Sequence, residues 1–247
     1  MKAKASAVVV GAGGDIGGAI ALQLAKIGFA VVAADSDLIA VEATASQVHE
    51  MHGQVLAIRC DVTAPNDVRN LCDETLTAFR RIDVLVYAAG LLRRNPVAGV
   101  SLEEWQEVMS VNLTGAFLCA QAVYEPMRQH GSGRIVNIGS IAGHSTSLLG
   151  GPDYTASKAG LLGLTRHLAR EWAPHGVTVN HISPGFIESQ MTRKNVSSEE
   201  WEAITRRIPT GRVGLPSDVA SVVSFLVSDE AAYVTGADVS VHGGLAL

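Results

Sequence analysis

Short apolar segments alternate with amphipathic segments along the whole chain of 247 residues. The apolar segments have the length of strands and are apolar almost continuously, which is typical of strands that are covered on both faces. The intervening segments have the length and the periodicity of helices. This alternation predicts an α/β fold: a single-domain, Rossmann-type, doubly wound parallel sheet of about seven strands with helices on both faces.

The predicted elements leave only short connections between them. Strands are expected at Ala7–Val10, Phe29–Ala34, Val55–Arg59, Val84–Tyr87, Arg134–Ile138, Val177–Ile182 and Val239–Val241. Helices are expected near Ile16–Ile27, Leu38–His52, Pro65–Phe79, Leu102–Gln129, Tyr154–Trp172 and Pro216–Val227. No linker or repeat divides the chain, so we expect one domain over residues 1–247.

A glycine-rich turn follows the first predicted strand. Gly11 and Gly17 lie six residues apart, and Ile16 occupies the place of the third glycine in the common Gly-x-Gly-x-x-Gly spacing. Glycines let the backbone approach a pyrophosphate, and the N-terminus of the following helix offers free N–H groups. An ordinary tight connection is the alternative, but the strand–turn–helix context favours a nucleotide site.

Asp35 ends the second predicted strand, 18 residues after Gly17. A carboxylate at this place can accept hydrogen bonds from the hydroxyls of an adenosine ribose. No arginine or lysine lies between Phe29 and Arg59 to neutralise a 2′-phosphate, which favours NAD over NADP as cofactor. The alternative is a turn or helix-capping aspartate, a role that Asp37 also fits.

Tyr154 and Lys158 stand four residues apart at the start of a predicted helix, and therefore on one face of it. An ammonium beside a phenol favours the phenolate and lowers its pKa toward a value useful for acid/base catalysis. Taken alone, such a pair is more often part of a solvated helix face.

Taken together, Gly11, Asp35, Asn112, Ser140, Tyr154 and Lys158 resemble the classical short-chain dehydrogenase/reductase family, in its beta-ketoacyl-carrier-protein reductase and sugar or polyol dehydrogenase branch. The resemblance covers essentially the whole chain. It implies a catalytic set of Asn112, Ser140, Tyr154 and Lys158. Tyr154 would act as the acid/base, Ser140 would position the substrate oxygen, and Asn112 would relay the proton through a water with Lys158.

The resemblance also implies a set of residues that contact the cofactor. They are Gly11, Asp15, Ile16, Gly17, Asp35, Asp61, Val62, Ala89, Gly90, Tyr154, Lys158, Pro184, Gly185, Ile187 and Ser189. Val10, Asp15 and Tyr87-Ala88 depart from the family pattern. Asp15 replaces a glycine, and we interpret it as a helix cap turned away from the phosphates.

The function expected from these residues is that of an NAD-dependent oxidoreductase that interconverts a secondary alcohol and a ketone, such as a sugar acid or polyol. One alternative is a 3-oxoacyl-carrier-protein reductase that uses NADPH, and another is a non-catalytic nucleotide-binding regulator. Arg93, Arg94, Arg193 and Lys194 could bind an anionic substrate, although four solvated side chains are the simpler interpretation. The polar residues 188–212 form a candidate substrate lid, called here the lid segment, for which a plain solvated helix pair is the alternative.

Composition excludes several other classes. The net charge of −5 and the lack of a basic block argue against nucleic acid as a partner. No apolar run reaches the roughly 18 residues of a membrane span. Cys60, Cys72 and Cys119 are odd in number and lack metal-ligand spacing, so we expect no metal, free thiols and a cytoplasmic protein. The apolar stretches Leu113–Val123 and Leu161–Leu168, together with the family resemblance, predict a homotetramer.

Overall fold

The computed structural model describes residues 5–246, which contain one seven-stranded parallel sheet in the order β3-β2-β1-β4-β5-β6-β7. The strands are β1 (Ser6–Val10), β2 (Ala30–Asp35), β3 (Val55–Arg59), β4 (Val84–Tyr87), β5 (Gly133–Ile138), β6 (Val177–Pro184) and β7 (Asp238–Val241). The strand order reverses between β1 and β4. In open α/β sheets a ligand crevice forms at this reversal, beyond the carboxyl ends of the strands.

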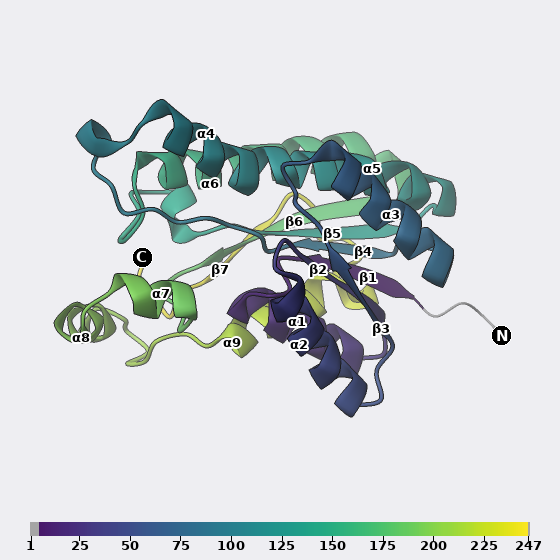
Figure 1. Cartoon of the computed structure of the whole chain (residues 1–247), viewed down its shortest axis with the longest axis horizontal. Coiled ribbons are helices and arrows are strands. Elements are labelled where there is room, and N and C mark those ends of the chain that lie inside the picture. Colours follow the sequence, from purple (N-terminus) through teal and green to yellow (C-terminus); the bar gives the residue numbers. More distant parts are fainter. Residues whose placement is uncertain (1–4, 247) are drawn as a thin grey trace.

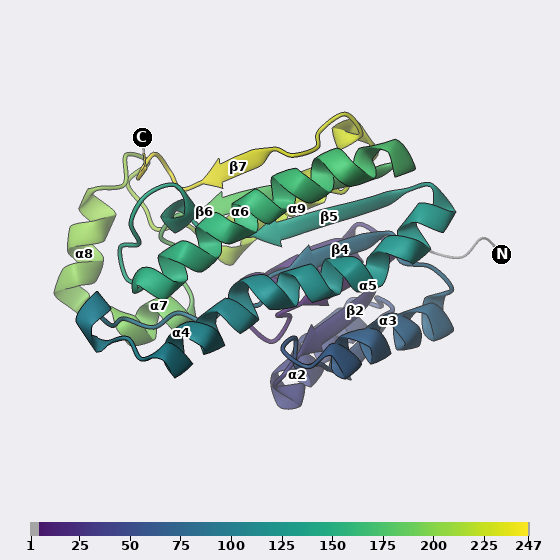
Figure 2. The same ribbon diagram turned by 90° about the horizontal axis from the view of Figure 1, so that it is seen from above.

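Helices cover both faces of the sheet (Figure 1). On one face lie α1 (Asp15–Lys26), α2 (Leu38–Glu50) and α9 (Pro216–Leu226). On the other lie α3 (Pro65–Phe79), α4 (Leu102–Met109), α5 (Gly115–His130) and α6 (Pro152–Trp172). Two short helices, α7 (Gln190–Asn195) and α8 (Ser198–Arg206), lie beyond one end of the sheet, as the view from above also shows (Figure 2).

The central strand β1 explains why both faces must be covered. Val8 and Val10 pack into the core on the side of α5, whereas Ala7 and Val9 pack into the core on the side of α1. All four side chains are at most 1% exposed. Burying a valine side chain contributes about 1.5–3 kcal/mol, so a strand buried on both sides is a large source of stability.

The predicted sheet is confirmed, and its strand ends agree within two residues. The single helix expected at Leu102–Gln129 is wrong, because a π-helical turn at Ser110–Thr114 separates α4 from α5. The hydroxyl of Tyr87 donates a hydrogen bond to the carbonyl of Val111 inside this turn. This contact lies within the π-helical turn, next to Asn112.

The lid segment contains α7 and α8. The hydroxyl of Ser189 caps α7 by accepting from the N–H of Thr192, and Ser197 caps α8 by accepting from the N–H of Glu200. Both helices therefore begin at residues that suit a helix start.

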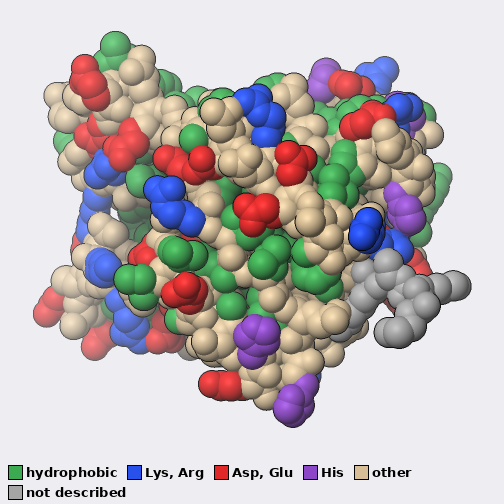
Figure 3. All heavy atoms as spheres, turned by 45° about the vertical axis from the view of Figure 1, so that its right-hand side comes forward, with side chains coloured by type: hydrophobic (Ala, Val, Ile, Leu, Met, Phe, Trp, Pro, Cys, Tyr) green, Lys and Arg blue, Asp and Glu red, His purple; other side chains and the backbone are tan. Residues whose placement is uncertain are grey.

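No helix among residues 5–246 is long and apolar enough to cross a membrane. The described part of the chain also contains no group of three or more histidine, cysteine or acidic side chains that could hold a metal ion. On the face shown in Figure 3, lysine and arginine side chains are interspersed with acidic ones and form no continuous basic area.

Candidate active site

The glycine turn after β1 is packed too closely for larger residues. Gly11 has a φ of +84°, and a Cβ there would lie 2.5 Å from the backbone nitrogen of Ala89. A Cβ on Gly17 would lie 2.0 Å from the carbonyl oxygen of Gly11. A Cβ on Gly14, in contrast, would make only an ordinary van der Waals contact, with the Gly11 oxygen at 3.5 Å. The turn therefore exposes its backbone to a crevice, as binding of a dinucleotide requires.

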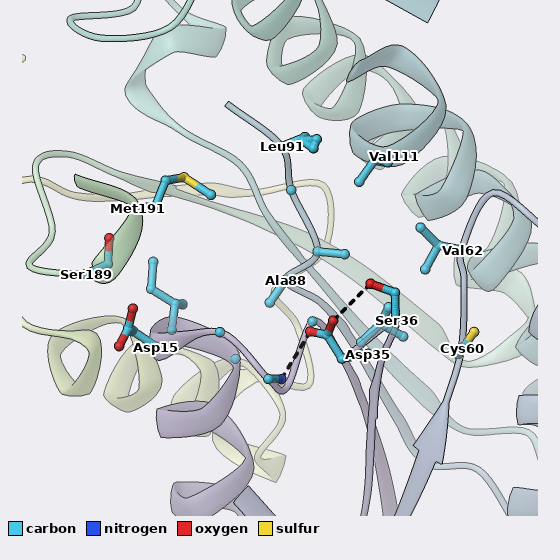
Figure 4. Close-up of a pocket in the computed structure, with 18 of the residues that line it drawn as sticks. Asp15, Asp35, Ser36, Cys60, Val62, Ala88, Leu91, Val111, Ser189 and Met191 are labelled. Atoms are coloured by element: carbon cyan, nitrogen blue, oxygen red, sulfur yellow. Dashed lines mark hydrogen bonds between the residues drawn. The ribbon is translucent and has the colours of Figure 1, made fainter. Parts of the chain in front are cut away.

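The crevice gathers most of the predicted cofactor residues (Figure 4). Its lining includes Gly11, Asp15, Ile16, Gly17, Asp35, Asp61, Val62, Ala89, Gly90 and Ser189. A second pocket adjoins it, sharing Ile16 and Ser189, and contains Ser140, Tyr154, Pro184, Gly185 and Ile187. Lys158 lies close to Gly90, because a Cβ on Gly90 would be 3.5 Å from its Nζ. The structure thus brings all these residues to one region, at the carboxyl ends of the strands.

Asp35 lies in the wall of the crevice rather than capping a helix. Its Oδ2 accepts from the N–H of Gly13 at 3.1 Å, and its Oδ1 accepts from the N–H of Asp37 at 3.2 Å. Asp37 itself is the cap of α2 and accepts from the N–H of Ile39 and of Ala40. The carboxylate of Asp35 therefore fastens the glycine turn to the end of β2.

Asp15 does not have the expected capping role. The N-cap of α1 is Gly14, and Asp15 is the first residue of the helix. Its carboxylate accepts a hydrogen bond from the N–H of Gln190 in the lid segment at 2.7 Å. The interpretation as a cap is wrong because the side chain extends across the crevice instead of back along its own helix.

Lys158 and Tyr154 lie on the same side of α6, Lys158 buried and Tyr154 half-buried. The Nζ of Lys158 donates to the carbonyl of Ile138 at 3.0 Å and lies 5.6 Å from the centre of the Tyr154 ring. Burial lowers the pKa of Lys158 to about 8. Burial also raises the pKa of Tyr154, and a hydrogen bond with Ser140 opposes that rise. Burial thus acts on the Tyr154 pKa in the direction opposite to the lowering expected from Lys158.

Ser140 and Asn112 are fixed by backbone contacts. The hydroxyl of Ser140, just beyond β5, accepts from the N–H of Ala142 at 3.1 Å. The amide oxygen of Asn112 accepts from the N–H of Leu91 at 2.7 Å, and its nitrogen donates to the Leu91 carbonyl and to the hydroxyl of Ser157. Asn112 is fully buried, so its amide is engaged on both sides by the protein itself.

The pocket beside Ser140 and Tyr154 is mainly apolar, which the sequence analysis did not predict. Leu92, Leu148, Leu149, Phe186 and Met191 line it. The pair Leu148-Leu149 could have been noticed, because it interrupts a polar and glycine-rich segment just before Tyr154.

The cations expected near the substrate are mostly paired. Arg93 pairs with Glu107, Arg94 with Glu200, and Arg193 with Glu188. The guanidinium of Arg193 also lies 4.8 Å from the ring centre of Trp201. Lys194 is exposed and has no ion pair among the described residues. The three arginines are thus satisfied by neighbouring carboxylates, which does not favour an anionic substrate.

A buried histidine lies behind the site and was also missed. His181 on β6 is 0% exposed, and its Nδ1 lies 2.7 Å from the carboxylate of Asp238 on β7. His144 contacts the other oxygen of the same carboxylate. A Cβ on Gly139 would lie 1.9 Å from Nε2 of His181, so the imidazole fills the space that any larger residue before Ser140 would need.

Comparison with known proteins places this site in a family. A family model described as enoyl-(acyl carrier protein) reductase matches residues 11–246. A 3-oxoacyl-[acyl-carrier-protein] reductase of Synechocystis is 42% identical over 247 residues, covering 98% of this chain and 96% of that protein. The chain belongs to the classical short-chain dehydrogenase/reductase family.

Two further relatives are also named 3-oxoacyl-carrier-protein reductases. The 3-oxoacyl-[acyl-carrier-protein] reductase of Staphylococcus aureus strain Mu50 is 40% identical, covering 99% of each chain. The crystal structure of a 3-oxoacyl-[acyl-carrier protein] reductase from Brucella melitensis matches with a TM-score of 0.93 at 32% identity, covering 98% of this chain and 91% of that one. The protein is an NAD(P)-dependent oxidoreductase that acts on CH–OH groups, in the beta-ketoacyl-carrier-protein reductase branch.

These relatives contradict the predicted preference for NAD, because 3-oxoacyl-carrier-protein reductases use NADPH. The prediction rested on the sequence alone, in which no arginine or lysine lies between Phe29 and Arg59. In the folded sheet Arg59 of β3 is paired with Asp35 of β2, so that the two side chains lie on the same face. A cation on the neighbouring strand therefore lies on the same face as the carboxylate, although its guanidinium is nearest to Asp67, with Nη1 3.9 Å from the Asp67 Oδ2.

The buried His181 should make stability depend on pH. Burial holds its pKa below the ordinary value of 6.5, although the hydrogen bond with Asp238 acts in the opposite direction. The unfolded chain then takes up a proton before the folded protein does. The free energy of unfolding should be unaffected by this group above about pH 6.5 and decrease as the pH falls below it. Urea unfolding between about pH 5 and pH 8 measures this change.

In His181→Asn this part of the pH dependence should vanish. His167→Asn is the control, since the His167 side chain is 74% exposed. Identical pH dependence in the wild type and His181→Asn would contradict the assignment.

Proposed function

We propose that the protein reduces 3-oxoacyl thioesters to 3-hydroxyacyl thioesters, with NADPH as the hydride donor and an acyl carrier as the bearer of the substrate. The names of the relatives support this reaction. The observation within this chain that carries it is the apolar pocket beside Tyr154, formed by side chains such as Leu149, Phe186 and Met191. An acyl chain suits such a lining, whereas a sugar acid would leave its hydroxyl groups without partners.

Each catalytic residue at the pocket would have a separate role in the reduction. The bound nicotinamide supplies the hydride. Tyr154, whose phenol stays protonated because burial raises its pKa, would donate the proton to the substrate oxygen. The hydroxyl of Ser140 would hold that oxygen by a hydrogen bond. Lys158 would keep a positive charge near the developing oxyanion, and Asn112 would fix the helix turn and the loop at Leu91.

The lid segment, residues 188–212, would close over both pockets. Ser189 and Met191 line the cofactor crevice and the apolar pocket alike. Movement of this segment would therefore admit the cofactor and the substrate together. We further propose that the enzyme works in the cytoplasm, where the buried thiols of Cys60, Cys72 and Cys119 would remain reduced.

An assay of substrate classes tests the proposed reaction. The enzyme should oxidise NADPH in the presence of a 3-oxobutanoyl thioester and give little turnover with sugar acids or polyols. Tyr154→Phe removes only the hydroxyl, so folding should persist while turnover falls by ~100- to 10,000-fold. Tyr233→Phe is a matched control, because Tyr233 is 103% exposed and should behave as wild type. Turnover of a sugar acid but not of any 3-oxoacyl thioester would refute the proposal.

Arg59 provides a test of cofactor recognition. If its guanidinium offsets the charge of Asp35 and attracts a 2′-phosphate, Arg59→Ala should raise KM for NADPH by roughly three- to tenfold. The KM for NADH should change little. The effect should be modest because the Arg59 side chain is 61% exposed and its charge is screened. Arg69→Ala, another exposed arginine that contacts Asn66 on α3, is the control. Equal changes with both cofactors would rule out a contact with the 2′-phosphate.

Most of the apolar side chains in Leu113–Val123 and Leu161–Leu168 pack into the core of the chain itself, so these stretches require a partner less than expected. Phe117 on α5 is still 44% exposed, and Trp105 on α4 is 36% exposed. We propose a homotetramer in which this surface of α4 and α5 is covered.

Light scattering at micromolar concentration should therefore report four subunits. Phe117→Glu should give smaller species, because a carboxylate would be buried without a partner. Ile39→Glu, at a side chain of α2 that is 80% exposed, should leave the mass unchanged. A monomeric wild type would disprove the assembly.

A further inference from the structure

The first turn of α1 contacts the lid segment directly. The Oδ2 of Asp15 accepts from the N–H of Gln190 at 2.7 Å, across 175 positions in the sequence. Asp15 is the first residue of α1 and Gln190 the first residue of α7. Figure 4 shows the Asp15 carboxylate at the rim of the crevice, on the side of Ser189. The contact therefore closes one side of the cofactor crevice.

A carboxylate at this place is unfavourable for binding a phosphate. The N-terminus of α1 and the glycine turn present N–H groups to the crevice, and a pyrophosphate would approach them there. The negative charge of Asp15 would repel it. A glycine or an uncharged side chain would avoid this cost, so the contribution of Asp15 must come from its contact with the lid segment.

The opposite end of α7 is also held. Arg94, from the loop between β4 and α4, donates to the carbonyl of Asn195 at 2.6 Å and to the carboxylate of Glu200 at 2.6 Å. At the start of α7, Ser189 and Thr192 form reciprocal capping hydrogen bonds that stabilise its first turn. Two contacts, at the first and last residues of α7, thus hold it across the crevice.

We propose that Asp15 is a latch that keeps α7 closed over the cofactor crevice, so that the dinucleotide exchanges only when the hydrogen bond from Gln190 to Asp15 breaks. This inference rests on the proposed function only in that the crevice binds a nicotinamide dinucleotide. It assigns Asp15 as a positioning residue, which acts on the cofactor through the lid segment.

Two neutral variants separate the latch from simple repulsion. Asp15→Asn removes the charge but keeps an oxygen that can accept from Gln190, whereas Asp15→Ala removes both. Stopped-flow fluorescence would measure the dissociation rate of NADPH from each. The latch predicts dissociation roughly three- to tenfold faster from Asp15→Ala than from Asp15→Asn. If Asp15 acted by repulsion alone, the two rates would be equal and both slower than in the wild type, and the proposal would be overturned.

The N–H of Gln190, which donates the hydrogen bond to Asp15, can be removed without changing Asp15. Gln190 is the first helical residue of α7, where proline is well tolerated, and Ser189 before it is extended, with φ −156° and ψ 163°. Gln190→Pro therefore removes the single N–H with little change of backbone, and Gln190→Ala is the control that retains it. In the Gln190→Pro background, Asp15→Ala and Asp15→Asn should release NADPH at the same rate. A persistent difference there would show that the oxygen of residue 15 acts on something other than Gln190.

Hydrogen exchange of the enzyme alone gives a readout that needs neither cofactor nor turnover. Amides of residues 188–197 should exchange faster in Asp15→Ala and in Gln190→Pro than in Asp15→Asn and Gln190→Ala. Unchanged exchange in all four variants would refute the latch. The test also stays separate from the proposed reaction, because an enzyme inactive on 3-oxoacyl thioesters would still show the difference in exchange.

Discussion

The buried ammonium of Lys158 constrains the whole catalytic side of the molecule. The side chain is 4% exposed, and its Nζ donates to the carbonyl of Ile138, the last residue of β5. A charged group this far from water requires a polar partner, so α6 must lie against the end of β5. That position brings Tyr154, one turn earlier on α6, next to Ser140, two residues beyond the strand. The same burial lowers the pKa of Lys158 to about 8, which makes its charge sensitive to the neighbouring groups.

A second set of contacts links β4 to this arrangement through the π-helical turn. Asn112 binds both backbone groups of Leu91 and the hydroxyl of Ser157, and so joins the loop after β4 to α6. Tyr87, which stands where the family usually has an asparagine, binds the carbonyl of Val111. Its ring is fully buried, and a Cβ on Gly115 would lie 2.5 Å from its hydroxyl. The buried phenol of Tyr87 therefore contacts the helix at Val111, in place of the smaller asparagine amide that the family usually has at residue 87.

The sequence predicted those features that depend on local patterns. The ends of β3, β4 and α3 agree with prediction, because apolar runs and a proline at a helix start mark them within a few residues. The contact of Tyr87 with Val111 in the π-helical turn joins residues 24 positions apart, and no local pattern marks it. The pairing of Arg59 with Asp35 depends likewise on strand register. The apolar pocket is assembled from side chains distant in sequence, such as Leu92 and Phe186, which only the tertiary fold brings together.

The two walls of the site differ in how firmly they are held. Lys158 and Asn112 make buried hydrogen bonds, which are costly to break because each leaves a polar group without water. The lid segment is tied by exposed pairs such as Arg94 with Glu200, and such pairs contribute only about 0–1 kcal/mol. Within the lid segment, α8 is anchored by the buried Ile204 and by Trp201, whose ring centre lies 4.8 Å from that of Phe186. No residue of α7 is buried. Opening should therefore occur at α7 while α8 and the catalytic wall stay in place, so that the cofactor can exchange without disturbing the residues that carry the chemistry.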